Sequence, residues 1–302
     1  MTETPILALD NVSKVFGKTG NPVYAARSVS FALNAGRTLA LVGESGSGKT
    51  TCARLIMREY QPDQGQLLFR GQPVGGSAVG SLSAYRRAVQ MIFQDPFSAL
   101  NPAHTVQYHL ERPLRLHQKE LDAARRRVAI AELLERVKLD PAIVAAKFPH
   151  ELSGGQRQRI SIARALAVGP EVIVADEPTS MLDVSVRLGI LNLLNEMKRS
   201  LGLALLYITH DIATARYVAE DIIVMYAGQI VEWGPTESVL TDPQHPYTRL
   251  LLSAVPDPDV RFAQSSYNAE LADVENIRRL SAVPQANVHE VGPGHFIRPI
   301  AG

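Results

Sequence analysis

The chain has 302 residues, enough for one large domain or for a core domain with an appendage. Its 31 Lys and Arg nearly balance 30 Asp and Glu, and the formal net charge of +1 disfavours nucleic acid or an acidic surface as its main partner. Hydrophobic residues at 46% and charged residues at 20% exclude the highly charged disordered class. The single cysteine, Cys52, excludes an intrachain disulfide and a cysteine-ligated cluster held by this chain alone.

No apolar stretch has the length of a membrane-spanning helix. The run at residues 201–208 falls well short of the roughly 20 residues that such a helix needs. Residues 1–10 contain no basic segment followed by an apolar core, so we expect no secretory signal. These features predict a cytoplasmic location.

Short apolar runs predict the strands of an α/β fold. Residues 38–42, 172–175 and 204–208 are each followed by polar or glycine-rich residues and then a helix-like pattern, as in a buried parallel sheet. Residues 6–16 and 23–33 alternate apolar and polar side chains, which indicates half-exposed antiparallel strands beside that sheet.

Strand signals disappear between residues 95 and 151. We expect a helical insertion at about 95–160, within a main domain of residues 1–240. Its clearest helix has an apolar stripe at spacings of three and four, with Arg125, Arg126 and Arg127 facing solvent. The stripe consists of Leu121, Ala124, Val128, Ala131 and Leu134.

Prolines punctuate the chain after Gly234. We expect residues 241–302 to form a C-terminal extension that is partly irregular, above all beyond Arg261.

A glycine-rich motif between a predicted strand and a predicted helix matches G-x-x-x-x-G-K-[ST]. Glycines let the backbone wrap phosphates closely while the next helix presents its positive N-terminal end. We expect Lys49 to bridge the β- and γ-phosphates and the Thr50 hydroxyl to bind Mg²⁺. The expected ATP-binding residues are Gly43, Glu44, Ser45, Gly46, Ser47, Gly48, Lys49, Thr50 and Thr51.

Two carboxylates follow the apolar run at 172–175. The carboxyl ends of parallel strands are where such sheets place their ligands. We expect Asp176 to hold the magnesium ion and Glu177 to orient or deprotonate the attacking water.

A second set of exposed amides is predicted at a helix N-terminus, at Ser153, Gly154, Gly155 and Gln156. A phosphate-binding loop alone would fit a kinase, a GTPase or a helicase. Together with the LSGGQ sequence at 152–156, however, the chain resembles the ATP-binding subunit of ABC transporters over about residues 5–255. The resemblance implies a P-loop NTPase core that binds and hydrolyses ATP with Mg²⁺.

The resemblance also assigns roles to residues that mean little alone. Phe16 falls where the family stacks an aromatic ring on adenine, with Tyr24 as the alternative. Gln94 matches the glutamine that touches the magnesium ion and the attacking water.

Two further positions match loops of the family. Asp183 matches the dimer-contacting D-loop, although Met181 replaces its usual small residue. His210 matches the switch histidine at the γ-phosphate. The implied catalytic set is thus Glu177, His210 and Gln94, with Thr50, Gln94 and Asp176 at the metal.

ABC subunits of this kind work as head-to-tail pairs, with ATP held between the cradle of one copy and Ser153 and Gly155 of the other. The implied partners are a second ATP-binding subunit, of the same or a related chain, two transmembrane permease subunits and an extracytoplasmic substrate-binding protein. The implied location is peripheral, at the cytoplasmic face of the cell membrane. The helical insertion, moved through Gln94, is expected to pass closure to the permeases.

Two long strings, residues 93–102 and 242–256, resemble the ATPases of the oligopeptide/dipeptide importer group, which also serves nickel and some oligosaccharides. We expect His245, Pro246 and Tyr247 to form a proline-stiffened turn that packs an aromatic ring on the core. Some members of the group carry an iron–sulfur cluster in the tail; no cysteine follows Cys52, so we expect none here.

Two other functions stay open. One is a soluble ABC ATPase acting on nucleic acid or ribosomes, although neither a second cassette nor zinc ligands are present and the charge is near neutral. The other is an exporter subunit, against which residues 148–151 look importer-like. The transported solute is set by the implied binding protein and permeases, and the sequence leaves open whether the ATPase pair is a homodimer or a heterodimer.

Overall fold

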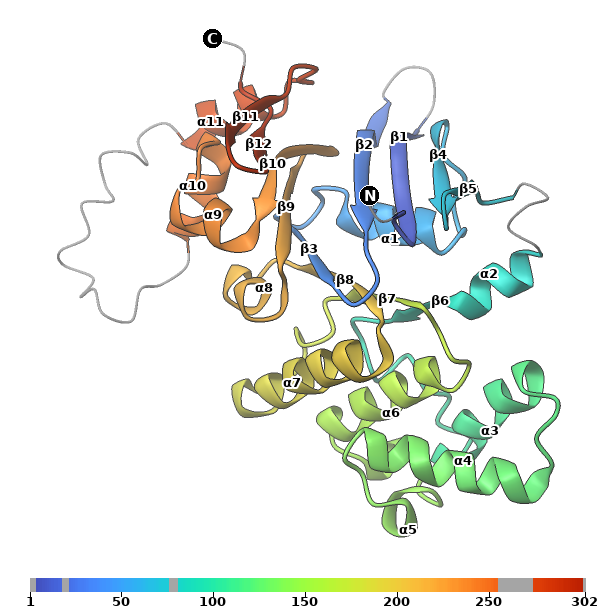
Figure 1. Ribbon diagram of the computed structural model, residues 1–302. Helices are drawn as coiled ribbons and strands as arrows, with labels where there is room; N and C mark the ends of the chain where they lie inside the picture. The colour runs from blue at the N-terminus through green and yellow to red at the C-terminus, as the bar shows by residue number, and fades with distance from the viewer. Residues whose placement is uncertain (1–3, 18–21, 76–80, 255–273, 301–302) are drawn as a thin grey trace. The chain divides into compact units, whose positions relative to one another are not determined.

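The computed structural model describes residues 4–17, 22–75, 81–254 and 274–300. The chain divides into two compact units (Figure 1). The β-rich unit comprises Leu7–Leu33, Thr38–Leu68 and Tyr207–Gly302, and the helical unit comprises Met1–Ile6, Asn34–Arg37 and Phe69–Leu206. Strand β8 (Ala204–Thr209) crosses from one unit to the other.

Antiparallel strands form one part of the β-rich unit. Strands β2, β1 and β4 lie side by side (Figure 1), and β1 pairs with β2 from Leu7 opposite Leu33 to Phe16 opposite Val23. The buried side chains are Leu7, Leu9 and Val12 of β1 and Ala26, Val29 and Leu33 of β2. Their spacing departs from strict alternation because register shifts interrupt the pairing of the two strands after Leu9. The strands are β1 (Leu7–Phe16), β2 (Val23–Leu33) and β4 (Gln64–Phe69).

The second part of this unit is a buried sheet. Strand β3 pairs in parallel with β9, every residue of β3 is buried, and β9 continues antiparallel into β10, β12 and β11. A cluster of apolar side chains, including Tyr247, packs beside it. The elements are β3 (Thr38–Val42), α1 (Lys49–Ile56), α8 (Ile212–Val218), β9 (Asp221–Tyr226), β10 (Gln229–Pro235), α9 (Thr236–Thr241), α10 (Pro246–Ser253), α11 (Val274–Ser281), β11 (His289–Gly292) and β12 (His295–Ile297).

The helical unit pairs two parallel strands, β6 and β7, with packed helices. Helices α3, α4 and α6 contact one another, and α6 also contacts α7. The elements are β5 (Gln72–Pro73), α2 (Leu82–Ala88), β6 (Val89–Ile92), α3 (Val106–His117), α4 (Ala123–Arg136), α5 (Pro141–Val144), the 3₁₀ helix η2 (Pro149–Glu151), α6 (Gly154–Leu166), β7 (Val172–Asp176) and α7 (Val184–Leu201).

The sequence predicted the strands well. The runs at 38–42, 172–175 and 204–208 correspond to β3, β7 and β8, and the alternating segments to the antiparallel pair β1 and β2. Residues 95–160 are helical wherever they are regular. No helix among the described residues is long and apolar enough to span a membrane.

The predicted buried stripe of α4 is confirmed at Leu134 and wrong at Val128. Val128 is 59% exposed, and the buried positions are Ile130 and Leu134. The face has turned toward Arg126, whose guanidinium lies 3.5 Å from the Glu111 carboxylate of α3. An arginine stem packs on apolar surface while its head finds a charge partner, so Arg126 occupies a position that the pattern had given to solvent.

The C-terminal segment is more regular than its proline pattern predicts where it is described. Residues 274–300 form α11 and the strands β11 and β12, and β12 pairs with β10. The expected irregularity from Arg261 to residue 273 lies outside the described residues.

Candidate nucleotide-binding site

The glycine-rich loop leads from β3 into α1 in the β-rich unit. A Cβ atom on Gly43 would lie 2.2 Å from the Met225 carbonyl oxygen, and one on Gly48 would lie 2.3 Å from the Ala25 carbonyl oxygen. Gly48 also has a φ of 109°, in the left-handed region. The loop is therefore wedged against neighbouring strands so closely that only glycine fits at these two positions.

Lys49, the first residue of α1, has its ammonium group inside this loop. Its Nζ donates to the carbonyl oxygens of Gly43 at 2.7 Å and Glu44 at 2.8 Å. The side chain is buried, whereas Thr50 is exposed beside it. The loop thus gathers a buried cation, a hydroxyl and the positive end of a helix, a set of groups suited to phosphates.

Glu44 is held by two residues of the C-terminal segment. Its backbone N–H donates to the Tyr247 hydroxyl at 3.2 Å, and its carboxylate accepts from Arg278 Nη2 at 2.8 Å. Tyr247 is fully buried, and its ring lies 4.2 Å from that of Tyr226. Burial raises the pKa of Tyr247, so its hydroxyl stays protonated.

Sequence reasoning missed this contact with the loop. The expected packing of the turn is confirmed, because His245 caps α10, Pro246 begins it and the Tyr247 ring belongs to the core cluster. Nothing in the motif, however, indicated that the Tyr247 hydroxyl reaches the glycine-rich loop.

The two adenine-stacking candidates lie on neighbouring strands. Phe16 ends β1 with its ring 36% exposed and in edge contact with Tyr60, at a centroid distance of 5.1 Å. Tyr24 is also exposed, but the Arg27 guanidinium lies 4.5 Å from its ring. The Lys14 ammonium lies 5.5 Å from the Phe16 ring, so each of the two rings is partly exposed and has a cation near it.

His210 lies at the carboxyl end of β8 and is exposed. The next residue, Asp211, caps α8 by accepting hydrogen bonds from the backbone N–H groups of Ala213 and Thr214. This cap fixes where the strand ends, and so where the histidine is presented.

The helical unit brings together Gln94 and Glu177. Gln94 Nε2 donates to Glu177 Oε2 at 2.8 Å, although 83 residues separate them in sequence. Asp176 ends β7 and is buried, and Glu177 follows with a positive φ of 45°. A non-glycine residue in that region is strained, a feature that clusters at functional sites.

Helix α6 begins at the Ser-Gly-Gly sequence. Ser153 caps it in a reciprocal capping box: its hydroxyl accepts from Gln156 N at 3.3 Å, and Gln156 Oε1 accepts from Ser153 N at 3.0 Å. The side chain of Gln156 thus serves the helix end here. The amides of Gly154 and Gly155 lie in the first turn, where helical N–H groups have no intrahelical acceptor.

The loop from Ser180 to Asp183 packs on this helix start. A Cβ on Gly154 would lie 3.5 Å from Leu182, and one on Gly155 would lie 2.5 Å from Val186 of α7. Beside these contacts, large apolar side chains remain exposed: Met181, Leu188 and the 81% exposed Val184.

Cys52 lies inside α1 and is fully buried. Burial raises its pKa to about 12, so the group is a thiol at neutral pH.

The fold and these loops define a protein of the P-loop NTPase fold. The family model described as "ABC transporter" matches residues 26–180, and that described as "Oligopeptide/dipeptide transporter, C-terminal region" matches residues 231–278. The chain belongs to the ABC transporter family.

Relatives and solved structures agree with this assignment. The chain is 46% identical over 95% of its length to the glutathione import ATP-binding protein GsiA of Salmonella paratyphi A, and 45% identical over 97% to GsiA of Escherichia coli. It covers 46% and 48% of these proteins, and so spans about half the length of the curated relatives it matches.

Solved ABC structures share the fold. CbiO1 from Clostridium perfringens, described as part of the ABC transporter complex CbiONQ, superposes with a TM-score of 0.70 at 26% identity, over 82% of this chain and 96% of that one. The dimeric ATP-binding cassette MJ0796, bound to ADP and Pi, superposes with a TM-score of 0.68 at 31% identity, over 76% of this chain and 98% of that one.

Proposed function

We propose that this chain is the ATP-binding and ATP-hydrolysing subunit of an ABC importer for peptides or a related small solute. The match of the oligopeptide/dipeptide transporter C-terminal region to residues 231–278 carries the proposal, because it ties the cassette to one importer group. The relatives named for glutathione import support a small peptide as the solute.

The residues of the cradle suit ATP and Mg²⁺. The glycine backbone and Lys49 would hold the phosphates, and Phe16 would stack on adenine. Thr50, Gln94 and Asp176 would hold the metal. When bound, Mg²⁺ neutralises charge on the phosphate oxygens.

Glu177 would position the attacking water and accept its proton. Its carboxylate is itself positioned by the 2.8 Å hydrogen bond from Gln94, so a movement of Gln94 would change how the base is aimed. His210 would contact the γ-phosphate. The Gln94–Glu177 contact supports a link between hydrolysis and the helical unit.

Two cassettes would pair head to tail, with the amides after Ser153 of one copy facing the nucleotide of the other. The exposed apolar group of Met181, Val184 and Leu188 supports a partner at this surface, because such side chains gain free energy when an interface covers them. Asp183 lies among them and is exposed.

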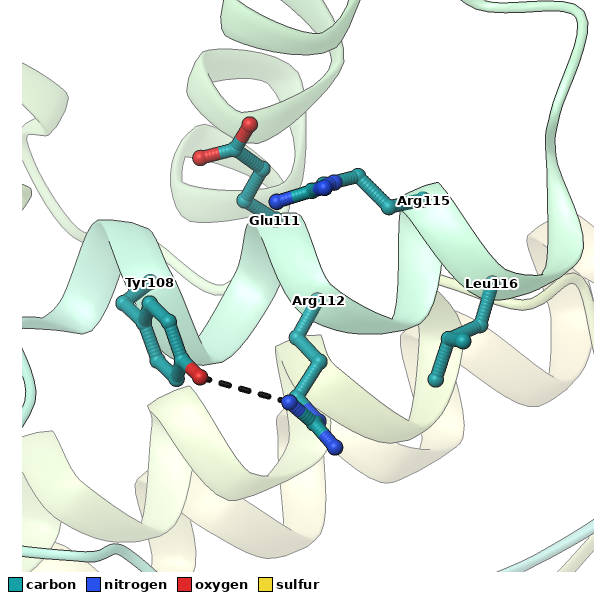
Figure 2. A pocket seen from close by; sticks show the side chains of 5 residues that line it. All are labelled: Tyr108, Glu111, Arg112, Arg115 and Leu116. Carbon is teal, nitrogen blue, oxygen red and sulfur yellow. Dashed lines mark hydrogen bonds between the residues drawn. The ribbon is translucent and has the colours of Figure 1, made fainter.

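The helical unit also offers a surface for a permease. A pocket of about 240 Å³ on α3 is lined by Tyr108, Glu111, Arg112, Arg115 and Leu116, and Figure 2 shows the Tyr108 hydroxyl meeting Arg112. Two arginines outnumber the one carboxylate of its lining, and Tyr108 and Leu116 add apolar surface, so it would suit a partner segment that carries both apolar and acidic groups. We place the chain at the cytoplasmic face of the membrane, in a complex with two permeases and a substrate-binding protein.

The Glu177→Gln variant tests the hydrolytic role. It keeps the size and hydrogen bonding of the side chain and removes the base, so ATP binding should persist while turnover falls by about 100-fold or more. Unchanged turnover would refute the role of Glu177. Purification from detergent-solubilised membranes tests the importer: copurifying multispanning permeases support it, whereas ribosomes or DNA would establish the alternative, a soluble ABC ATPase.

A further inference from the structure

A second cavity lies within the β-rich unit, and none of its lining residues is assigned to ATP. Its volume is about 420 Å³. Strands β1 and β2, the first residue of β10 and the C-terminal segment line it. The lining residues are Asn11, Arg27, Ser28, Ser30, Gln229, Pro284, Gln285, Ala286 and Arg298.

The lining is rich in hydrogen-bond donors and holds two positive charges. Arg27 and Arg298 come from opposite ends of the sequence, and none of the nine lining residues carries a carboxylate. The Gln229 amide is already engaged: its Nε2 donates to the Ser281 and Val283 carbonyl oxygens, and its Oε1 accepts from Gln285 N. Gln229 thus fixes the C-terminal segment as one wall.

Three buried N–H groups of this wall and of β2 have no acceptor. Arg27 Nε, Arg298 Nε and Gln285 Nε2 are each buried without a hydrogen-bond partner in the part of the chain that the structure describes. Buried donors are nearly always satisfied, because an unpaired one loses its bond to water and gains nothing. These three atoms have almost no accessible surface, so the parts of the two arginine side chains that can meet a ligand are the remaining N–H groups of their guanidinium heads.

Aromatic rings that do not line the cavity lie beside the two guanidinium groups, and one hydrogen bond within the lining holds Arg298. Arg27 lies 4.5 Å from the Tyr24 ring, and Arg298 lies 6.0 Å from the Trp233 ring and donates to the Ser28 carbonyl oxygen at 3.3 Å. Burial alone lowers the pKa of Arg298, with no carboxylate opposing the shift. An anion in the cavity would supply the missing counter-charge.

We propose that this cavity binds a phosphate group, either as free phosphate or as the phosphate of a small ester. Two guanidinium groups with the hydroxyls of Ser28 and Ser30 beside them offer more donors than the two oxygens of a carboxylate can use, and so suit the three or four terminal oxygens of phosphate. The volume leaves room for a small organic group. A phosphate bound here joins β2 to the segment that carries Arg298.

Calorimetric titration of the full-length chain tests the site, with inorganic phosphate and glycerol 3-phosphate as probes. A Lys49→Ala background weakens competing binding in the glycine-rich loop. We expect phosphate to bind, and Arg27→Gln or Arg298→Gln to weaken that binding at least tenfold. Arg136→Gln, an exposed arginine on α4, is the matched control and should bind like the background chain.

Gln285→Glu is a second test variant, because it replaces an amide by a negatively charged carboxylate of nearly the same size. The carboxylate should repel phosphate and abolish its binding. This variant keeps the proposal testable if an arginine variant fails to fold. Tighter binding of the ester than of phosphate identifies a phosphate ester as the ligand, and the reverse identifies free phosphate. Absence of binding, or equal binding by the background chain, Arg27→Gln and Gln285→Glu, overturns the proposal. ATP binding by the parent chain is measured separately. If the parent chain binds ATP but one of these two negative results is found, the phosphate site is refuted and the proposed ATPase function is not.

Discussion

Tyr247→Phe removes one hydroxyl oxygen and leaves the buried ring in place. In the folded chain that oxygen accepts the Glu44 backbone N–H at 3.2 Å, at the second position of the glycine-rich loop. The ring contacts with Tyr226 and the apolar cluster survive the substitution. The change therefore isolates a single hydrogen bond between the C-terminal segment and the loop.

The free-energy cost of Tyr247→Phe depends on how well water can replace the lost acceptor of the Glu44 backbone N–H. A satisfied hydrogen bond contributes about 0.5–1.5 kcal/mol net, and a buried donor left unpaired costs about 1–3 kcal/mol. Glu44 is half-buried, so water reaches part of the site and the lower half of that range applies. We expect Tyr247→Phe to lose about 1–2 kcal/mol of stabilising free energy. If the whole of that loss affects the nucleotide-bound form of the loop, the ATP affinity falls by about 5- to 30-fold.

Two measurements check this expectation: titration with a fluorescent ATP analogue, and urea unfolding. Tyr108→Phe is the matched control, since it removes an exposed hydroxyl whose partner is Arg112 on the same helix. Arg278→Gln should have a smaller, salt-sensitive effect of about 0.2–1 kcal/mol, because its pair with Glu44 is substantially exposed. A Tyr247→Phe chain that matches the parent in both ATP affinity and unfolding free energy would show that the segment does not support the loop.

Three other residues give sharp predictions. Gly155→Ala should lower the free energy of unfolding, measured in urea, by about 1–3 kcal/mol, because the new Cβ would lie 2.5 Å from Val186. The double variant Gly155→Ala with Val186→Ala should recover most of this stability. If it recovers none, contact with Val186 is not the cause. Cys52, buried with its pKa raised to about 12, should resist alkylation by iodoacetamide at pH 8 until urea unfolds the chain; rapid labelling of the folded chain would count against that burial. Burial lowers the pKa of His245 from 6.5 to about 4, so the unfolded chain binds the extra proton between these values. Its contribution to stability is complete above pH 6.5 and is lost at about 1.4 kcal/mol per pH unit toward pH 4. Unfolding measured across that window should show this slope in the parent and less of it in His245→Gln; equal slopes would exclude His245 as its source.

The helix α4 shows where pattern reasoning failed. Spacings of three and four fit both the predicted stripe through Val128 and the observed face through Ile130, so periodicity alone did not separate them. The packing of α4 against α3 and α6 decides which of these two faces is buried. A sequence window around one helix does not contain that information.

The phosphate-binding loop, the helix start at Ser153 and the strand ending at Asp176 were readable from the sequence because each is local. Their chemistry needs residues a few positions apart, and the backbone conformation of a glycine turn or a helix cap follows from those residues. The assignment of Gln94 and His210 rested instead on family resemblance, since a single polar residue after a strand has no distinguishing pattern.

Only the tertiary structure brought Glu44 against Tyr247 and Arg278, which follow it by 203 and 234 residues. The same holds for the Gln94–Glu177 hydrogen bond and for the three unpaired donors around the second cavity. Such contacts depend on how strands and helices pack, and a hydroxyl or guanidinium group has no preferred partner until that packing places one within about 3 Å. The sequence by itself determined which local loops are suited to phosphate. The tertiary structure decided which distant side chains contact and stabilise those loops.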